Sequence, residues 1–232
     1  MVGAWENKSG IPLLIATPNT DIVTMDWAVK FAGMWKPQGT FIQGWSGMPI
    51  DVARNVFVKN ARQLRAKYIL YLDSDVIPER EDWIKQLMDA QEPIISGLYW
   101  SKKGHPGIWL KNKEDPPDKQ TYSPVTSGFR GGSIIEVDVL GAGALLIDMR
   151  VFDVIDKVLG PLNDPQHPKL SKYFSWRWPD PEEVLPGEKS EDFYFCDLAQ
   201  RAGFSILCHT GIEMLHEQTV TWDNRGTPKA RG

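Results

Sequence analysis

Two aspartates separated by a single residue follow a short apolar run in this sequence. Residues 68–72 have the aromatic and branched side chains of a buried strand, and Asp73-Ser74-Asp75 comes directly after them. Ligands bind at the carboxyl ends of strands in open α/β sheets, so both carboxylates are expected at that edge. Neighbouring carboxylates repel each other unless a cation lies between them, and oxygen ligands of this kind suit Mg²⁺ or Mn²⁺. The pattern is typical of a metal–diphosphate site, and a solvated turn is the alternative.

A second acidic pair and a late histidine are further candidates. Glu191 and Asp192 open an expected helix, where acids interact favourably with the helix dipole without doing any chemistry. Because a long loop rich in Gly and Pro precedes them, one of the two also fits a general base facing a substrate. His216 ends a late apolar run. A neutral imidazole there would complete a metal shell begun by Asp73 and Asp75, and a hydrogen-bonded histidine without a chemical role is the alternative.

An arginine and a glycine-rich turn complete the set. Arg54 lies near the start of the long helix that precedes the two aspartates. It suits a bidentate contact with phosphate or with carboxylates, unless it is a surface residue. Gly141-Ala142-Gly143 separates two expected strands and allows either close approach to a ligand or a tight turn. The spacing is not that of a dinucleotide-binding fingerprint, and no P-loop motif is present.

An alternation of strands and helices must position these residues. Strands are expected at 13–17, 40–43, 68–72 and 94–98, with helices at 25–33, from 49 onward and at 81–90. That order predicts parallel pairing with helices on both faces of the sheet. Later strands are expected at 134–139, 144–147, 205–209 and 213–216, with helices at 151–159 and 191–202. Residues 101–133 are expected to form a polar loop or irregular hairpin, and 161–187 and the tail after 219 to be irregular.

Composition limits the function classes. The 232 residues are 42% hydrophobic and 24% charged, which is ordinary for a globular protein, and the net charge of −4 gives no basic field for nucleic acid. Cys196 and Cys208 form no CxxC pair and are expected to be buried thiols. Residues 1–8 are too polar for a signal peptide, and no apolar run approaches the roughly 20 residues of a membrane span. A cytoplasmic protein is therefore expected, with peripheral membrane contact left open.

Tryptophan is abundant, with ten residues in the chain. Several lie in loop-like contexts, and a Trp beside Gly or Pro suits a platform that stacks on sugar rings or bases as well as core packing. These are Trp35, Trp45, Trp100, Trp109, Trp176, Trp178 and Trp222.

Taken in chain order, the motifs resemble those of the GT-A fold glycosyltransferases. They are Ala16-Thr17-Pro18, Ala53-Arg54-Asn55, Tyr71-Leu72-Asp73-Ser74-Asp75, Val139-Leu140-Gly141-Ala142-Gly143, Glu191-Asp192-Phe193 and His216, and they cover about residues 11–217. The resemblance implies one α/β domain over 1–232, with a Rossmann-like, mixed and mostly parallel sheet flanked by helices. It implies a nucleotide-binding half at 11–100, a donor-sugar and acceptor half at 101–217 and an irregular tail at 218–232.

The resemblance also implies an activity. It is the metal-dependent transfer of a sugar from a nucleotide-diphosphate sugar to an acceptor hydroxyl, with Mn²⁺ or Mg²⁺ as cofactor. The acceptor stays open among a glycan, a lipid, a protein and a small polyol. The base and sugar of the donor, and inversion or retention at the anomeric carbon, stay open too.

Roles for individual residues follow from the same resemblance. Asp75 would bind the divalent ion, Asp73 would share it or lie nearer the ribose, and His216 would be a late metal ligand. The donor would be bound by Thr17, Pro18 and Asn19 at the nucleoside, by Arg54 near the diphosphate, by Ser74, and by Gly141, Ala142 and Gly143 at the sugar. Glu191 or Asp192 would be the catalytic base beside the acceptor in an inverting enzyme.

Two other function classes stay open. A haloacid dehalogenase-like phosphatase also uses Asp-x-Asp after a strand, but on the first strand of its core. It carries Thr or Val two residues after the second aspartate, where this chain has Ile77. A non-catalytic module that binds nucleotide sugars or carbohydrates on the same fold is the other class, because a fold does not fix a function.

Overall fold

The computed structural model describes residues 12–19, 22–100, 105–116, 120–128, 131–163, 166–176, 190–217, 220–222 and 228–230. Its first half contains β1 (Leu13–Asn19), α1 (Met25–Gly33), β2 (Phe41–Ser46), α2 (Ile50–Gln63), β3 (Tyr68–Leu72), β4 (Val76–Pro78), α3 (Trp83–Asp89) and β5 (Ile94–Tyr99). Its second half contains β6 (Ile108–Lys111), β7 (Tyr122–Pro124), β8 (Ile134–Val137), β9 (Val139–Leu140), β10 (Ala144–Asp148), α4 (Arg150–Leu159), α5 (Glu191–Arg201), β11 (Ile206–His216), β12 (Val220–Trp222) and β13 (Pro228–Ala230).

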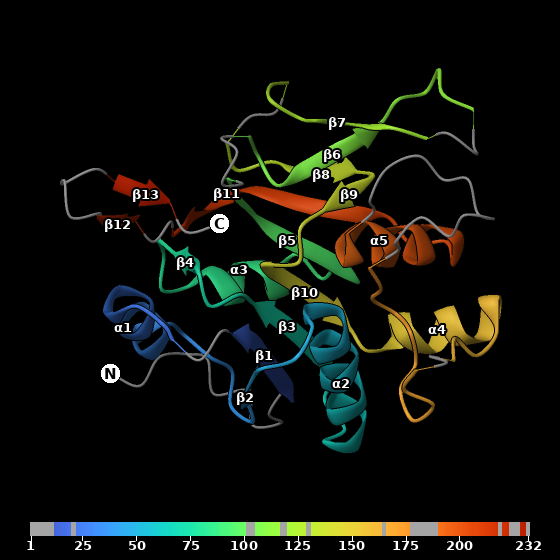
Figure 1. Ribbon diagram of the computed structural model, residues 1–232, viewed down its shortest axis with the longest axis horizontal. Helices are drawn as coiled ribbons and strands as arrows, with labels where there is room; N and C mark the ends of the chain where they lie inside the picture. Colours follow the sequence, from blue (N-terminus) through green and yellow to red (C-terminus); the bar gives the residue numbers. More distant parts are fainter. Residues whose placement is uncertain are drawn as a thin grey trace.

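An eight-stranded mixed sheet crosses the molecule, with helices on both of its faces (Figure 1). The strand order is β2-β1-β3-β10-β5-β11-β4, and β8 pairs with β11 outside this path. β1 is parallel to β2 and β3, as the alternation of elements predicts. β5 is parallel to β11, a pairing that the alternation did not predict. The sheet departs from that prediction at β10, which lies between β3 and β5 and runs antiparallel to both. All five residues of β10 are buried, so this apolar run belongs in the middle of the sheet.

Alternate residues of the central strands pack into two hydrophobic cores, one on each face of the sheet. Leu14 and Ala16 of β1 face the core that includes Phe57 of α2. Leu13 and Ile15 face the opposite core, which includes the side chains of Trp27 and Trp83. A strand with both faces covered must be apolar at every position, which explains the unbroken apolar runs in the sequence. The sheet is thereby fixed between two helical layers.

α1 is tied directly to the Asp-x-Asp turn. Thr24 caps the helix, and its hydroxyl accepts a hydrogen bond from the Trp27 amide at 3.1 Å. The indole nitrogen of Trp27 donates to the Asp73 carbonyl oxygen at 3.1 Å. Trp27 is itself buried in the core. The buried helix therefore fixes the backbone that carries the first aspartate.

Several segments differ from the expectation. β11 is one continuous strand instead of two, with a register shift between His209 and Glu213. Gly211 lies inside this shift, and only glycine fits there because a Cβ would lie 2.6 Å from the Cα of Gly132. Within 101–133, β6 and β7 pair and join β9 in a three-stranded sheet, so the hairpin alternative is the one observed. The tail expected to be irregular contains the antiparallel pair β12 and β13, and β4 extends the main sheet where no strand was expected.

Both cysteines are free and buried, as expected. Burial raises the pKa of the Cys196 and Cys208 thiols to about 12. Neither is therefore a thiolate near neutral pH.

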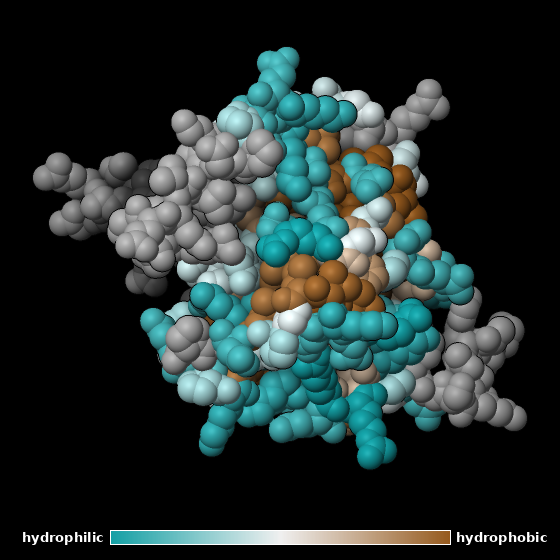
Figure 2. All heavy atoms as spheres, turned by 90° about the vertical axis from the view of Figure 1, so that its right-hand side faces the viewer, coloured by the Kyte–Doolittle hydropathy of each residue, from teal (hydrophilic) through white to brown (hydrophobic). Residues whose placement is uncertain are grey.

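Every helix within the described ranges is too short or too polar to cross a bilayer. Figure 2 shows the face that bears α4 and α5, where patches of hydrophobic residues are separated by hydrophilic ones. Single exposed apolar side chains such as Val158 are normal on such a surface.

Candidate active site

The Asp73-Ser74-Asp75 turn lies at the carboxyl end of β3, as the sequence predicts. The Asp73 amide donates to the Gly143 carbonyl at 3.0 Å, and the Asp73 carbonyl accepts from the Val76 amide at 3.1 Å. The side chain of Asp73 is 21% exposed and that of Asp75 is 37% exposed. Backbone hydrogen bonds thus hold the turn at Asp73, and the carboxylate of Asp75 is the more exposed of the two.

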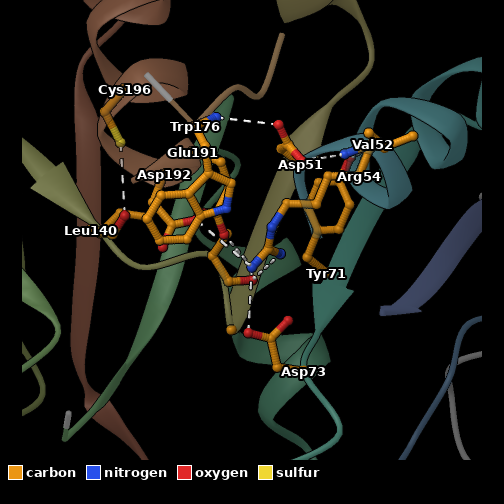
Figure 3. A network of polar contacts seen from close by, with 12 residues as sticks. Asp51, Val52, Arg54, Tyr71, Asp73, Leu140, Trp176, Glu191, Asp192 and Cys196 are labelled. Atoms are coloured by element: carbon orange, nitrogen blue, oxygen red, sulfur yellow. Dashed lines mark hydrogen bonds and ion pairs between the residues drawn. The ribbon is translucent and has the colours of Figure 1, made fainter. Parts of the chain in front are cut away.

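Arg54 gathers three carboxylates that come from two distant parts of the chain (Figure 3). Its Nη2 lies 3.4 Å from Asp73 Oδ2, 3.5 Å from Glu191 Oε1 and 3.7 Å from Asp192 Oδ1. Its Nη1 donates to the Ala142 carbonyl at 3.4 Å. Arg54 is only 1% exposed, so it is not a surface residue. The sequence predicts that Arg54 contacts either phosphate or carboxylates, and the structure contains the contact with carboxylates.

Two aromatic rings fix the position of that guanidinium. Arg54 Cζ lies 5.3 Å from the ring centre of Tyr71 and 6.0 Å from that of Phe174. The Tyr71 hydroxyl donates to the Arg54 carbonyl oxygen at 2.9 Å. Cation–π contacts of this kind are stronger when the charge is desolvated. Arg54 therefore has little freedom to leave the carboxylates.

The acids of this cluster have more acceptor capacity than Arg54 satisfies. Asp73 Oδ1, Glu191 Oε2 and Asp192 Oδ1 are buried and have no hydrogen-bond partner. Burial raises the pKa of Asp73, Glu191 and Asp192, and Arg54 opposes the rise in each case. Burial alone would lower the pKa of Arg54, but the three carboxylates outweigh it and the pKa of Arg54 is raised. The cluster thus favours a ligand that brings cationic charge or hydrogen-bond donors.

Asp75 and His216 meet on the other side of the turn. β11 pairs with β4 so that His216 lies opposite Val76, which brings His216 Nε2 to 3.3 Å from Asp75 Oδ2. His216 Nδ1 lies 2.9 Å from the Trp100 carbonyl oxygen. A carbonyl only accepts, so Nδ1 carries a proton, and in the neutral imidazole the Nε2 lone pair faces the carboxylate. That contact is favourable only with a proton or a cation between the two atoms.

The pair fits a divalent cation, because a histidine whose Nδ1–H bonds a carbonyl is oriented as metal-ligating histidines are. The expected three-residue shell is not assembled, however. No group of three or more His, Cys, Asp or Glu residues is close enough to hold a metal within the described ranges. Asp73 is separated from the pair because its carboxylate turns to Arg54. Within the described ranges, Asp75 and His216 can therefore supply two ligands of such an ion.

A cavity of about 200 Å³ adjoins the same turn. Its walls are Pro18, Trp45, Met48 and Ile50, together with Asp73, Ser74 and Asp75. The strand register explains the meeting of two of them, because Pro18 of β1 lies opposite Trp45 of β2. The sequence predicts Pro18 and Ser74 at the donor site, but Met48 and Ile50 were not predicted there. Their position in the chain, just after β2 and at the start of α2, is the feature that could have indicated them.

Thr17 and Asn19 are the other two residues expected to bind the nucleoside. Thr17 is 5% exposed, and its hydroxyl oxygen is buried without a hydrogen-bond partner. It does not line the cavity. Asn19 ends β1, but its side chain lies outside the described residues.

The glycine turn is shaped by Tyr99. A Cβ at Gly141 would lie 1.8 Å from the Tyr99 hydroxyl oxygen, and a Cβ at Gly143 would lie 2.9 Å from Val76 Cγ2. Ala142 between them is fully buried. The glycines are therefore needed to admit Tyr99 beside the cluster, and contact between this turn and a donor sugar stays a prediction.

We expect Gly141→Ala to destabilise the protein by about 1–3 kcal/mol, the usual cost of overpacking a core. In the double variant with Tyr99→Phe, the clash with the hydroxyl is gone but Tyr99 Cζ, 2.8 Å from the new methyl, stays, so recovery is partial. Unfolding in urea measures the free energy of unfolding of the single and the double variant. Gly131→Ala is the matched control, because nothing lies within 4 Å of a Cβ there. Equal stability of Gly141→Ala and Gly131→Ala would contradict this packing.

Comparison with known proteins supports the fold and not a family. No family model matches the chain, and no curated protein matches it. A197 from STIV has a TM-score of 0.55 at 13% identity, with 95% of this chain and 94% of A197 covered. GalNAc-T7, solved with UDP, GalNAc and Mn²⁺, has a TM-score of 0.54 at 8% identity, with 90% of this chain covered. S. aureus TarS has a TM-score of 0.49 at 11% identity, with 88% of this chain covered.

The matches differ in length. This chain covers 44% of the GalNAc-T7 chain and 36% of the TarS chain, so it spans less than half of either. Identities this low show similarity of fold alone. The mixed sheet and the helices that flank it agree with the GT-A fold of these structural neighbours. The protein is a single α/β domain with the GT-A fold.

Proposed function

We propose that this protein is a metal-dependent glycosyltransferase that moves a sugar from a nucleotide-diphosphate sugar to an acceptor hydroxyl. The observation that carries this proposal is the convergence of Asp73 with Glu191 and Asp192 on the buried Arg54, next to the pair of Asp75 and His216. The structure of GalNAc-T7 with UDP, GalNAc and Mn²⁺ supports the donor class and the cofactor, because that protein shares the fold.

Asp75 and His216 would hold Mn²⁺ or Mg²⁺. Their nitrogen and oxygen atoms suit Mn²⁺ in particular, since imidazole is a poorer partner for Mg²⁺. When bound, the ion neutralises negative charge on the departing nucleoside diphosphate. The chain itself keeps His216 in the required tautomer through the Trp100 carbonyl.

The cavity beside the turn would bind the nucleoside. Trp45 and Pro18 provide flat apolar walls for a base, and Ser74 provides a hydroxyl for the ribose or a phosphate. Thr17 and Asn19 stay proposed nucleoside residues at the end of β1. Arg54 would act on the donor indirectly, because its guanidinium is held by carboxylates and orients Asp73.

Asp192 would be the base that removes the proton from the acceptor hydroxyl. Its side chain is 18% exposed, whereas that of Glu191 is 5% exposed, so Asp192 is the more accessible of the pair. Burial and the neighbouring Glu191 raise the pKa of Asp192, and Arg54 opposes the rise. A raised pKa makes the ionised carboxylate a stronger base. Glu191 would position Arg54. A base of this kind is what an inverting transfer requires.

We expect one nucleoside diphosphate among UDP, GDP, CDP and ADP to bind in the presence of Mn²⁺, with the affinity falling at least about tenfold without it. Calorimetry measures this binding. Trp45→Ala should weaken binding by about tenfold or more, since stacking of a base on an aromatic ring contributes about 1–3 kcal/mol.

Trp35→Ala, which lies outside the cavity, is the control and should bind normally. No binding of any of the four diphosphates in either condition would contradict the proposal. A non-catalytic nucleotide-sugar module would show the same binding but would release no sugar.

A further inference from the structure

A segment inside the irregular stretch 161–187 is fastened to α2 by one asparagine. Asn55 Oδ1 accepts hydrogen bonds from the amides of Tyr173 and Phe174, both at 3.0 Å. Asn55 Nδ2 donates to the Phe174 carbonyl at 2.8 Å. The asparagine is 3% exposed, and Tyr173 and Phe174 are buried. A single side chain thus satisfies buried backbone groups that no helix or strand satisfies.

Other contacts hold the same segment at both ends. The Tyr173 hydroxyl donates to Asp156 Oδ2 of α4 at 2.7 Å. The amide of Trp176 donates to Asp51 Oδ2 at 3.2 Å. Asp51 and Asn55 are four residues apart on α2 and lie on one face of the helix. Residues 173–176 form what we call the α2 strap.

The strap ends in an abrupt change of exposure. Ser175 is 3% exposed, whereas Trp176 is 44% exposed. Exposure of a large aromatic ring costs hydrophobic free energy that burial would recover. A firmly anchored backbone that delivers an exposed indole is therefore an arrangement expected of a binding surface rather than of packing.

The strap passes beside the acidic cluster through Phe174. Phe174 stacks on Phe195 of α5, with ring centres 4.8 Å apart and an angle of 14° between the rings. Phe174 also lies against Arg54, which contacts Asp192. In the view of Figure 3 the indole of Trp176 overlaps Glu191 and Asp192, and Asp73 lies farther along, below Arg54.

We propose that Trp176 is the platform on which a carbohydrate acceptor stacks, and that Asn55 is the residue that positions it. This rests on the proposed function and narrows the acceptor to a sugar. The C–H face of a pyranose ring would lie on the indole, and one of its hydroxyls would reach Asp192. Asn55 does not touch the sugar and acts only through the strap.

Two assays test the platform. The first compares donor hydrolysis, in which water is the acceptor, with transfer to a panel of methyl glycosides. Trp176→Ala should raise the KM for the methyl glycoside at least about tenfold, equivalent to 1.4 kcal/mol, and leave the rate of hydrolysis within about twofold. Asn55→Ala should show the same split, with the donor KM unchanged. Trp35→Phe, outside this region, should change neither quantity.

The second assay is binding without turnover. Methyl glycosides should quench tryptophan fluorescence of the wild type, and Trp176→Phe should remove that signal. Hydrolysis by the wild type together with an unchanged glycoside KM in Trp176→Ala would overturn the platform and leave the proposed function standing. Glycoside quenching without hydrolysis of, or transfer from, any donor would overturn the proposed function, and Trp176 would then bind a carbohydrate that is not an acceptor. Absence of both quenching and glycoside-dependent turnover would overturn the platform.

Discussion

Replacing Arg54 with methionine should destabilise the protein by about 3–5 kcal/mol, the usual cost of leaving buried charges without their partner. Three carboxylates depend on this one guanidinium, and three of their oxygens already have no hydrogen-bond partner. Methionine keeps much of the volume, so the loss reports charge more than packing. Chemical unfolding at neutral pH measures it.

The same variant should recover as the pH falls. The pKa values of Asp73, Glu191 and Asp192 are raised in the folded protein, chiefly by burial, and removal of Arg54 raises them further. A carboxyl group with a raised folded pKa binds protons more tightly when folded. Its stabilising contribution is complete below the unfolded pKa and is lost as pH rises through the folded value. The deficit of Arg54→Met should therefore shrink steadily from neutral pH toward the ordinary carboxyl range.

Arg62→Met is the matched control. Arg62 pairs with Asp153 and Asp156, but its side chain is 36% exposed. Exposed pairs of this kind contribute about 1 kcal/mol or less, so this variant should be close to the wild type. Adding Asp192→Asn to Arg54→Met should restore part of the stability. If Arg54→Met is no less stable than Arg62→Met, the buried cluster is not organised as described.

The second large effect concerns the proposed base. Asp192→Asn should lower donor turnover by about 10²–10⁴-fold, the usual contribution of general base catalysis. The shape of the side chain is kept and one charge leaves an overcrowded acidic cluster, so stability should stay the same or rise. A rate loss without a stability loss separates a chemical role from a structural one.

Glu191→Gln is the comparison for that variant. Glu191 is less exposed and contacts Arg54 at 3.5 Å, so its substitution should reduce the rate less and leave donor affinity unchanged. Turnover at saturating donor and unfolding in urea are measured on the same preparations. Wild-type turnover in Asp192→Asn would exclude this residue as the base.

Much of the fold was predictable because it follows from local patterns. The apolar runs of β1, β3 and β5 are buried on both faces, and the boundaries of α1 match the sequence prediction because Thr24 caps it. β10 was predicted as a strand but not as the neighbour of β3 and β5. Pairing depends on contacts between segments far apart in the sequence, which local patterns do not contain.

The residue types of the candidate site were predictable from the sequence, but the contacts between those residues were not. The sequence placed Asp73, Asp75 and His216 together, whereas the structure joins Asp75 to His216 and Asp73 to Arg54. The direction in which a side chain turns depends on what is packed around it, here the rings of Tyr71 and Phe174. For the same reason Asn55 gave no signal beyond its place beside Arg54, since its partners lie in a segment without regular structure.

The most direct test of the proposed function is release of sugar from nucleotide-diphosphate sugars, measured with Mn²⁺ and with a chelator, for the wild type and for Asp75→Ala. Asp82→Ala is the control, because that aspartate pairs with Arg80 away from the acidic turn. We expect Mn²⁺-dependent release by the wild type and by Asp82→Ala, and a loss of at least about 10²-fold in Asp75→Ala, consistent with a Lewis-acid contribution of several kcal/mol. Release that is independent of Mn²⁺ and unchanged in Asp75→Ala, or no release from any donor, would contradict the account.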